Sequence, residues 1–338
     1  MVLRVAAGVL CTMSLFAAQP VATVAEIIAL VRSSIARNDA DTTLAKALHK
    51  LKPSERLEDR AVEELESAGA GPKSVLELAR LREASQTLPP PATEPEFPHD
   101  ETPSVADQRR IVAAAQEIAL HYARSLPDFI CNEVVRRYDD VRGAFALKDT
   151  LEVKLSYFDQ KENYRLLTVN GRPTIRPFEE VGGAVSEGEF GSMLFSLFSG
   201  ESKAVFRWNH WTTLRKRVAH VFSFRITPEN SNYRIRFSAG RLSGEYSTMA
   251  GQHGFVYVDR ETNEILRIVA EADGIPADFP VRQSSTVLDY DFAKVGSRQF
   301  LLPIRADVRM STSQVRTRNL VEFQGFRKFS GESTITFQ

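Results

Sequence analysis

The spacing of apolar residues divides the chain into a helical part and a strand-rich part. Between residues 20 and 86, apolar residues recur every three or four positions, as they do on one face of a helix. They include Val21, Val24, Ile27, Ile28, Val31, Leu44, Leu48 and Leu51. Asp41 offers a helix start, and the run Gly69–Pro72 turns the chain into a further helix over residues 74–84. The pattern predicts a small helical bundle over residues 20–86.

The period changes to two beyond a further helix, which is predicted over residues 105–126. Alternating residues predict strands over 151–157, 164–169, 219–226, 233–237, 254–259, 264–270, 285–292, 304–311, 319–326 and 333–337. Short connections rich in turn residues favour antiparallel pairing of consecutive strands. The sequence therefore predicts an α+β fold, in which a small N-terminal helical bundle and a Pro-rich linker precede a large curved antiparallel β-sheet, half-barrel-like, with one or two packed helices.

A proline-rich segment separates these two parts. Residues 87–104 contain six prolines, four acidic residues and no basic residue. Such a composition cannot bury a core and favours an extended, semi-rigid linker. The predicted organisation is a helical bundle over 20–86, a linker over 87–104 and an antiparallel β domain over 105–338, with helices at 105–126 and about 189–199.

The first residues read as a targeting signal. Arg4 precedes the apolar run Val5–Ala18, which has the length of a signal-peptide core and is too short to span a bilayer. We expect residues 1–19 to be a cleaved signal peptide and the mature protein to be periplasmic or secreted, with no membrane-spanning segment after processing. Cleavage would remove Cys11 and leave Cys131, among apolar neighbours, as the one remaining cysteine.

One apolar segment interrupts the predicted strands. A glycine-rich stretch over residues 182–191 leads into Ser192–Phe198, in which five of seven residues are large and apolar. The segment predicts a short helix that is either an ordinary core helix or a lid over an apolar cavity. On the second interpretation Met193, Phe195 and Phe198 are the candidate ligand-binding residues.

Charge and motifs exclude several kinds of function. The 338 residues carry 43 basic and 43 acidic side chains, so no global field draws the chain toward nucleic acid. No histidine pairing typical of a metal site and no nucleophile motif occurs, and we predict no cofactor and no metal. His210 and His220 flank the basic run 215–217, which indicates an exposed hairpin. Asp289, Asp291 and Asp307 lie on predicted strands, and nothing in the sequence pairs them.

One hairpin carries a family resemblance. Residues 254–268 form a strand, a D-x-x-T-x-x turn beginning at Asp259, and a second strand. This run resembles the central hairpin of the periplasmic lipoprotein-carrier class and of periplasmic sensors of anti-sigma factors. The resemblance implies, over residues 105–338, a concave antiparallel half-barrel that packs around helices and holds a lipid chain. The segment Leu126–Cys131, followed by Arg136–Tyr138 and later by Gly188–Gly191, also resembles uncharacterised exported proteins of Acidobacteria.

The N-terminal bundle has a second resemblance. Residues 65–78 resemble a helix-hairpin-helix turn, in which glycine amides at a helix N-terminus meet a phosphate, and also a helical repeat of bacterial envelope proteins. The neighbouring acids Glu63, Glu64 and Glu66 and the export signal oppose nucleic-acid binding. We therefore expect no nucleic-acid partner and a small interaction bundle that contacts an envelope protein.

Together these features favour a non-enzymatic binding protein of the cell envelope. Its curved sheet would hold a lipid or other apolar ligand, a lipoprotein, or a protein partner. The alternative is a periplasmic or secreted hydrolase with a site assembled across the sheet, so the sequence leaves the enzyme question open while favouring a non-enzyme. An apolar concave face beside the Ser192–Phe198 segment would support the first hypothesis, and a polar cleft with clustered carboxylates or histidines would support the second.

Overall fold

The computed structural model describes residues 20–93, 101–141, 144–177, 190–238 and 245–329. They belong to two compact units: Met1–Pro98 with Thr213–Lys216, and His99–Thr212 with Arg217–Gln338. The predicted signal peptide 1–19, the predicted strand 333–337 and the glycines at 182, 183 and 188 lie outside the described residues.

In the described part of the first unit, four helices surround one apolar core. They are α1 (Val24–Ala36), α2 (Asp41–His49), α3 (Asp59–Ser67) and α4 (Pro72–Ser85), and two short parallel strands, β1 (Val21–Ala22) and β2 (Lys52–Pro53), pair beside them. The core consists of the apolar residues at helical spacing, among them Ile27, Val31, Leu48, Leu65 and Leu78, each at most 1% exposed. The helical periodicity of the sequence therefore matches the buried face of each helix.

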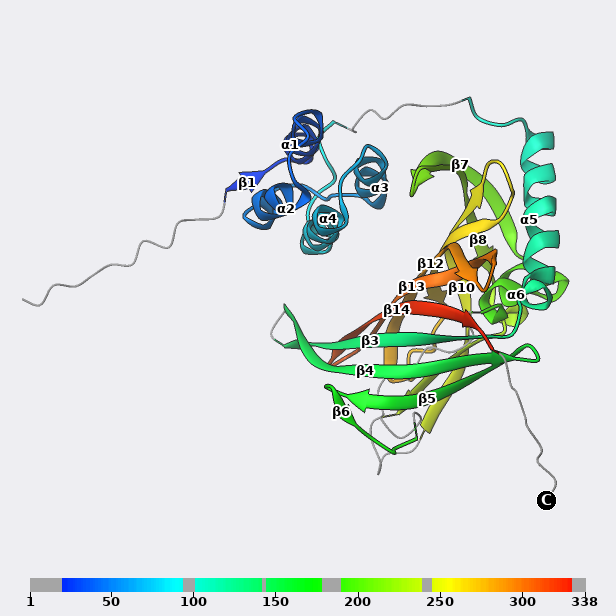
Figure 1. The fold of residues 1–338 in the computed structure, drawn as a ribbon. Helices are drawn as coiled ribbons and strands as arrows, with labels where there is room; N and C mark the ends of the chain where they lie inside the picture. The colour runs from blue at the N-terminus through cyan, green and yellow to red at the C-terminus, as the bar shows by residue number, and fades with distance from the viewer. Residues whose placement is uncertain (1–19, 94–100, 142–143, 178–189, 239–244, 330–338) are drawn as a thin grey trace, which may run out of the picture. The chain divides into compact units, whose positions relative to one another are not determined.

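The second unit is built on an open 12-stranded antiparallel sheet (Figure 1). Its strands are β3 (Phe129–Val141), β4 (Ala144–Phe158), β5 (Lys161–Val169), β6 (Arg172–Pro173), β7 (Val205–Leu214), β8 (Arg217–Ile226), β9 (Tyr233–Ser238), β10 (Glu245–Asp259), β11 (Ile265–Asp273), β12 (Val281–Val295), β13 (Arg298–Thr312) and β14 (Arg316–Lys328). The spatial order is β6-β5-β4-β3-β14-β13-β12-β11-β10-β8-β7, with β9 paired to β10. The predicted α+β class with a large curved antiparallel sheet is confirmed.

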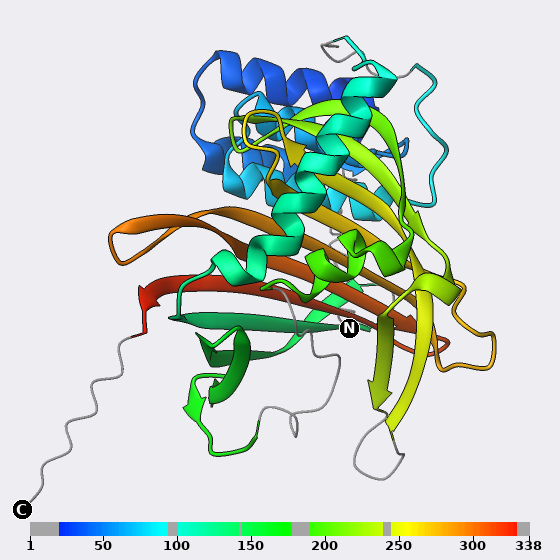
Figure 2. The same ribbon diagram turned by 90° about the vertical axis from the view of Figure 1, so that its right-hand side faces the viewer.

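Among the described residues, two α-helices and two single-turn helices accompany the sheet. They are α5 (Val105–Ser125), α6 (Ser192–Phe198), and the 3-10 turns η2 (Gly200–Ser202) and η3 (Pro228–Asn230). Ser104 caps α5 by accepting a hydrogen bond from the backbone N–H of Asp107. Figure 2 shows α5 lying across one face of the curved sheet, with α6 beside it. We call this face the inner face.

Two strands that the alternating pattern does not predict, β3 and β7, occupy important places in the sheet. β3 lies in its interior, between β14 and β4, and β7 forms one end. β3 carries Glu133 and Arg137, which are charged yet only 3% and 6% exposed. Because these buried charges interrupt the expected alternation, β3 does not show the usual sequence signature of a half-buried strand.

The strand β10 changes partners along its length. Two glycines at this change permit the close approach of neighbouring backbone. Its first half pairs with β9 alone, and its second half pairs with β8 and β11. A Cβ atom at Gly251 would lie 2.7 Å from the carbonyl oxygen of Ile226. Gly254 has φ +151°, and a Cβ atom there would lie 1.9 Å from the carbonyl oxygen of Val269.

We therefore predict that Gly254→Ala lowers the free energy of unfolding of the sheet unit by at least about 2 kcal/mol, because it adds backbone strain and a backbone clash. Gly296→Ala is the matched control: its φ is +64°, but no atom lies within 4 Å of the added Cβ. Chemical denaturation of both variants measures the difference. Equal losses in the two variants would contradict this explanation.

Candidate functional site

A continuous apolar row crosses the inner face of the sheet. Direct cross-strand partners on eight strands make up this apolar row: Leu151, Val135, Val321, Ala306, Leu288, Ile268, Val256 and Phe222. Each of them is at most 5% exposed. Because residues opposite one another on neighbouring strands have Cβ atoms about 5 Å apart, the row forms an unbroken apolar band from β4 to β8.

Two tyrosines hold the C-terminal half of α5 on the inner face: Tyr122 lies on α5 itself, and Tyr157 lies on β4. The hydroxyl of Tyr122 donates to the carbonyl oxygen of Leu301 at 2.9 Å, and its ring meets Tyr290 edge-on at 5.9 Å. The hydroxyl of Tyr157 donates to the carbonyl oxygen of Ala123 at 2.9 Å. Burial raises the pKa of Tyr122 well above its usual value, so this hydroxyl stays protonated and remains a donor.

The segment from Phe190 to Phe198 spans the inner face. At one end Phe190 contacts the rings of Phe129, Tyr157 and Phe323, which lie on β3, β4 and β14. At the other end Phe198 stacks on Phe206 of β7, with ring centroids 5.2 Å apart and planes inclined by 12°. The short helix α6 therefore lies between two ring contacts with distant parts of the sheet.

The three residues predicted to bind a ligand occupy different environments. Phe198 is 2% exposed and packs on β7, whereas Phe195 is 56% exposed and Met193 is half-buried. The amide of Gln116 on α5 donates to the carbonyl oxygen of Phe198 at 2.7 Å, which anchors the C-terminal end of α6. The structure thus brings Phe198 onto the sheet and leaves Phe195 at the surface.

A glycine permits the close approach of α6 to α5. Gly191 precedes α6 and has φ +140°, a conformation that side chains disfavour. A Cβ atom there would lie 2.9 Å from the Cβ atom of Ala123 on α5. After the C-terminal end of α6, the hydroxyl of Ser202 donates to the carbonyl oxygens of Leu197 and Ser199. The predicted flanking glycines 191 and 200 therefore lie at the two ends of α6.

A polar row lies next to the apolar row on the inner face. Its polar residues are Asp149, Arg137, Asn319 and Thr286, and the apolar Val308 lies between the last two; all are direct cross-strand partners in this order. Nε of Arg137 donates to Oδ1 of Asp149 at 2.6 Å, and Nη2 donates to Oδ2 at 2.5 Å, a bidentate pair whose side chains are 8% and 13% exposed. The inner face is thus amphiphilic, which the sequence analysis missed.

The basic run 215–217 lies at the turn of a hairpin between β7 and β8, but His220 on β8 is buried rather than exposed. His220 is 5% exposed, and its ring lies 4.0 Å from the ring of Trp211 and 5.6 Å from that of Trp208. Burial lowers the pKa of His220 to about 4, with a smaller contribution from the charge of Arg260. The imidazole is neutral at physiological pH and packs as an aromatic residue.

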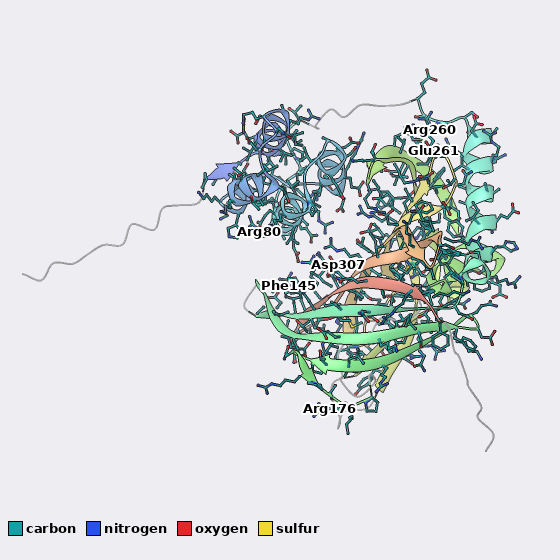
Figure 3. The ribbon with its side chains drawn as sticks, viewed as in Figure 1. Arg80, Phe145, Arg176, Arg260, Glu261 and Asp307 are labelled. Carbon is teal, nitrogen blue, oxygen red and sulfur yellow. The ribbon has the colours of Figure 1, made fainter. Side chains whose placement is uncertain are left out.

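Two of the three aspartates left open by the sequence, Asp289 and Asp307, are paired with arginines, and Asp291 accepts a hydrogen bond from the backbone N–H of Phe292. Nε of Arg267 donates to Oδ1 of Asp289 at 2.6 Å, and both Arg309 and Arg318 contact Asp307, which is labelled in Figure 3. Burial alone would raise the pKa of Asp307, but the two arginines outweigh it and lower the pKa. Among the described residues no group of three or more His, Cys, Asp or Glu side chains is arranged to hold a metal ion. Burial also raises the pKa of Cys131 far above its usual value.

The hairpin that carries the family resemblance is held by Asp259. Its Oδ1 accepts hydrogen bonds from the backbone N–H groups of Glu261 and Thr262 and from the Thr262 hydroxyl, and Nε of Arg217 donates to Oδ2 at 2.6 Å. Arg260 and Glu261 in this turn are labelled in Figure 3. The D-x-x-T spacing is therefore a turn-forming device that positions β10 against β11.

The helix start that resembles a phosphate-binding turn is occupied by a carboxylate. At the N-terminus of α4, the backbone N–H groups of Lys73 and Ser74 donate to Asp41 at 2.9 Å each, and the Ser74 hydroxyl donates to it at 2.6 Å. A Cβ atom at Gly71 would lie 2.4 Å from the carboxyl carbon of Asp41. The amides that would meet a phosphate in a nucleic-acid-binding hairpin are engaged within the unit.

Comparisons with solved structures give low-scoring matches. A LolA superfamily protein from Nitrosomonas europaea matches with a TM-score of 0.31 at 11% identity, over 66% of this chain and 94% of that one. A DUF1329 family protein from Desulfovibrio piger matches with 0.30 at 11% identity, over 66% and 95%. The MucA/MucB complex of Pseudomonas aeruginosa matches with 0.20 at 12% identity, over 65% and 99%.

These matches include the carrier class that residues 254–268 resemble, but scores this low establish no relationship. No family model matches the chain, and no curated protein is similar to it in sequence. Within the described residues, no helix has the length and apolar character needed to cross a membrane. The function has to be inferred from the side chains of the chain itself.

We predict that replacing the two phenylalanines of α6 lowers the stability of the fold by very different amounts. Phe198→Ala should lower the free energy of unfolding by about 3–5 kcal/mol, as expected for a buried ring. Phe195→Ala should change it by less than about 1 kcal/mol, because the side chain is largely exposed. Urea denaturation of the two single variants tests this, and a large loss for Phe195→Ala would show that α6 packs differently.

We also predict that the helical unit loses stability in acid through Asp41. Burial raises the pKa of this carboxyl, but hydrogen bonds from Ser74 and Lys73 outweigh burial and hold the pKa below its usual 3.8. The ionised form therefore stabilises the fold, fully above the unfolded pKa and progressively less as the pH falls through the folded pKa.

Asp41→Asn should weaken protection of the α4 amides from hydrogen exchange by about 1–2 kcal/mol at pH 7. It should also flatten the dependence of this protection on pH between about 5 and 3. Asp107→Asn is a matched control at the first turn of α5. A variant at Asp41 with unchanged protection and an unchanged pH profile would contradict the assignment.

Proposed function

We propose that this chain is an exported, non-enzymatic binding protein of the cell envelope that holds an amphiphilic lipid on the inner face of its sheet. The observation that supports this proposal is that an apolar row and a polar row lie side by side on the inner face. An apolar row crosses eight strands, and a row containing Arg137 and Asp149 lies directly beside it. An acyl chain matches the first row, and a polar head group matches the second.

The buried pair of Arg137 and Asp149 supports a recognition role. Removing two charges from water costs several kcal/mol per ion, and replacing such a pair with apolar residues is often neutral or stabilising. A sheet that needed only a core would gain nothing from this pair. Its place at one border of the apolar row suits a polar group that has to be oriented rather than merely enclosed.

The segment Phe190–Phe198 is the element that would move to admit the ligand. It lies on the inner face and is anchored at both ends by ring contacts, with Phe129 at one end and Phe206 at the other. The helix between these anchors has only seven residues and is bordered by glycines at 191 and 200. A ligand chain would take over the apolar contacts that this segment makes in its absence.

Native mass spectrometry and organic extraction of the protein purified from its own envelope should reveal a bound lipid, and a fluorescent fatty-acid probe should compete with it. Met193→Ser/Phe195→Ser should weaken probe binding, because it reduces the apolar surface of α6 while leaving Phe198 in place. Tyr246→Ser/Met249→Ser, at exposed apolar positions 46% and 39% accessible on β10, is the matched control.

A second variant tests the role of the polar row. Arg137→Met/Asp149→Leu removes both charges together, so the fold is retained. It should keep binding a purely apolar probe and lose its preference for lipids with a polar head group. If the wild-type protein carries no lipid and binds no probe, the proposed function is wrong.

A further inference from the structure

We propose that one end of the outer face of the sheet, opposite the inner face, docks on an anionic lipid membrane. The surface, which we call the basic end, consists of Phe158, Phe329, Lys154, Lys161, Arg165 and Arg327, on or next to β4, β5 and β14. Exposed aromatic rings, charge and strand register define the basic end, and its role is independent of any ligand on the inner face.

Two phenylalanines lie exposed together at the ends of their strands. Phe158 ends β4 and is 56% exposed, and Phe329 follows β14 and is 39% exposed. Their ring centroids are 5.7 Å apart with planes inclined by 63°. The backbone N–H of Phe329 donates to the carbonyl oxygen of Asp128, and that of Asp159 donates to the Asp128 carboxylate, so the two strand ends are held together.

Cross-strand rows beside these rings carry cations without acids. One row is Gln324, Asn132, Lys154 and Arg165, the next is Arg327, Ile130, Ser156 and Asn163, and the last pairs Phe158 with Lys161. These residues alternate with Phe129, Cys131, Leu155 and Tyr157, which are buried on the inner face, so they lie on the outer face.

None of the four cations makes an ion pair with any described residue. Lys154 and Arg165 are even direct cross-strand neighbours, an arrangement of like charges that is destabilising unless an anion neutralises it. Three acids lie nearby: Asp159 in the turn between β4 and β5, Glu162, which accepts hydrogen bonds from Tyr164 and from the backbone of Phe190, and Glu152, which precedes Lys154 by two residues on the outer face of β4. None of these acids forms an ion pair with the four cations, so the positive charge of the cationic rows is not neutralised by direct contact.

The rest of the outer face shows the contrast. There Arg267 pairs with Asp289, Arg309 and Arg318 share Asp307, and Arg136 pairs with Glu322 at 3.1 Å. Cations in the middle of the sheet are thus matched with carboxylates, whereas those at the basic end are not. This difference points to an external anionic surface at that end.

A lipid surface fits this arrangement better than a nucleic acid. A sheet that binds single-stranded nucleic acid interleaves aromatic rings with its cations so that bases can stack. Here the two cationic rows contain no aromatic residue, and both rings lie beyond them at the strand ends. The exposed rings at the strand ends match the apolar layer of a membrane interface, and the lysines and arginines beside them match its anionic head groups.

The test uses the full mature chain and sedimentation with vesicles of phosphatidylcholine, with or without phosphatidylglycerol. We expect binding to the anionic vesicles that weakens with salt, and little binding to neutral ones. Lys161→Glu/Arg165→Glu should reduce the affinity at least tenfold, since each cation near an anionic surface contributes a factor of about five. Arg234→Glu/Lys294→Glu, at exposed positions elsewhere, changes the net charge equally and should have little effect.

A second pair of variants tests the rings. Phe158→Ser/Phe329→Ser should weaken vesicle binding, whereas Leu147→Ser/Val315→Ser should not; the latter residues are 55% and 42% exposed at the other end of the sheet. Melting temperatures of all variants report folding. Absence of wild-type binding to anionic vesicles, equal losses in test and control variants, or tighter binding of single-stranded nucleic acid through the same residues would overturn the proposal.

Discussion

The sheet unit depends on one constraint, the strict register of its long antiparallel strands. Because side chains alternate between faces, a slip of one residue in any strand would move its inner-face residues to the outer face. The apolar row survives across eight strands only because every pair, from Leu151 with Val135 to Val256 with Phe222, is in phase. The position of the polar row beside it is fixed by the same register.

Helix α5 and the Phe190–Phe198 segment contribute in different ways to this face. Tyr122 and Tyr157 tie α5 to the sheet with hydrogen bonds to main-chain carbonyls, which require specific geometry. The segment is held at both its ends chiefly by ring contacts, which are less directional. The movement proposed for this segment would therefore leave α5 and its contacts with the sheet in place.

Periodicity was sufficient to predict the helical bundle, α5 and most strands, because their apolar residues face a single core. It failed at β3, where Glu133 and Arg137 are buried. The partner that neutralises Arg137, Asp149, lies on another strand, and spacing along one strand cannot reveal it. For the candidate site, composition identified α6 as unusually apolar, but only the three-dimensional packing separates Phe198, which is buried, from Phe195, which is exposed.

The pairing of β3 with β14 has a consequence for how the protein folds. These adjacent strands join residues as distant in sequence as Asn132 and Gln324, and both lie in the interior of the sheet. Contacts of such high sequence separation form slowly, because the loop entropy has to be lost before the contacts form. The centre of the sheet therefore closes only after nearly the whole domain has been synthesised, and until then one edge of β3 stays unpaired and open to aggregation.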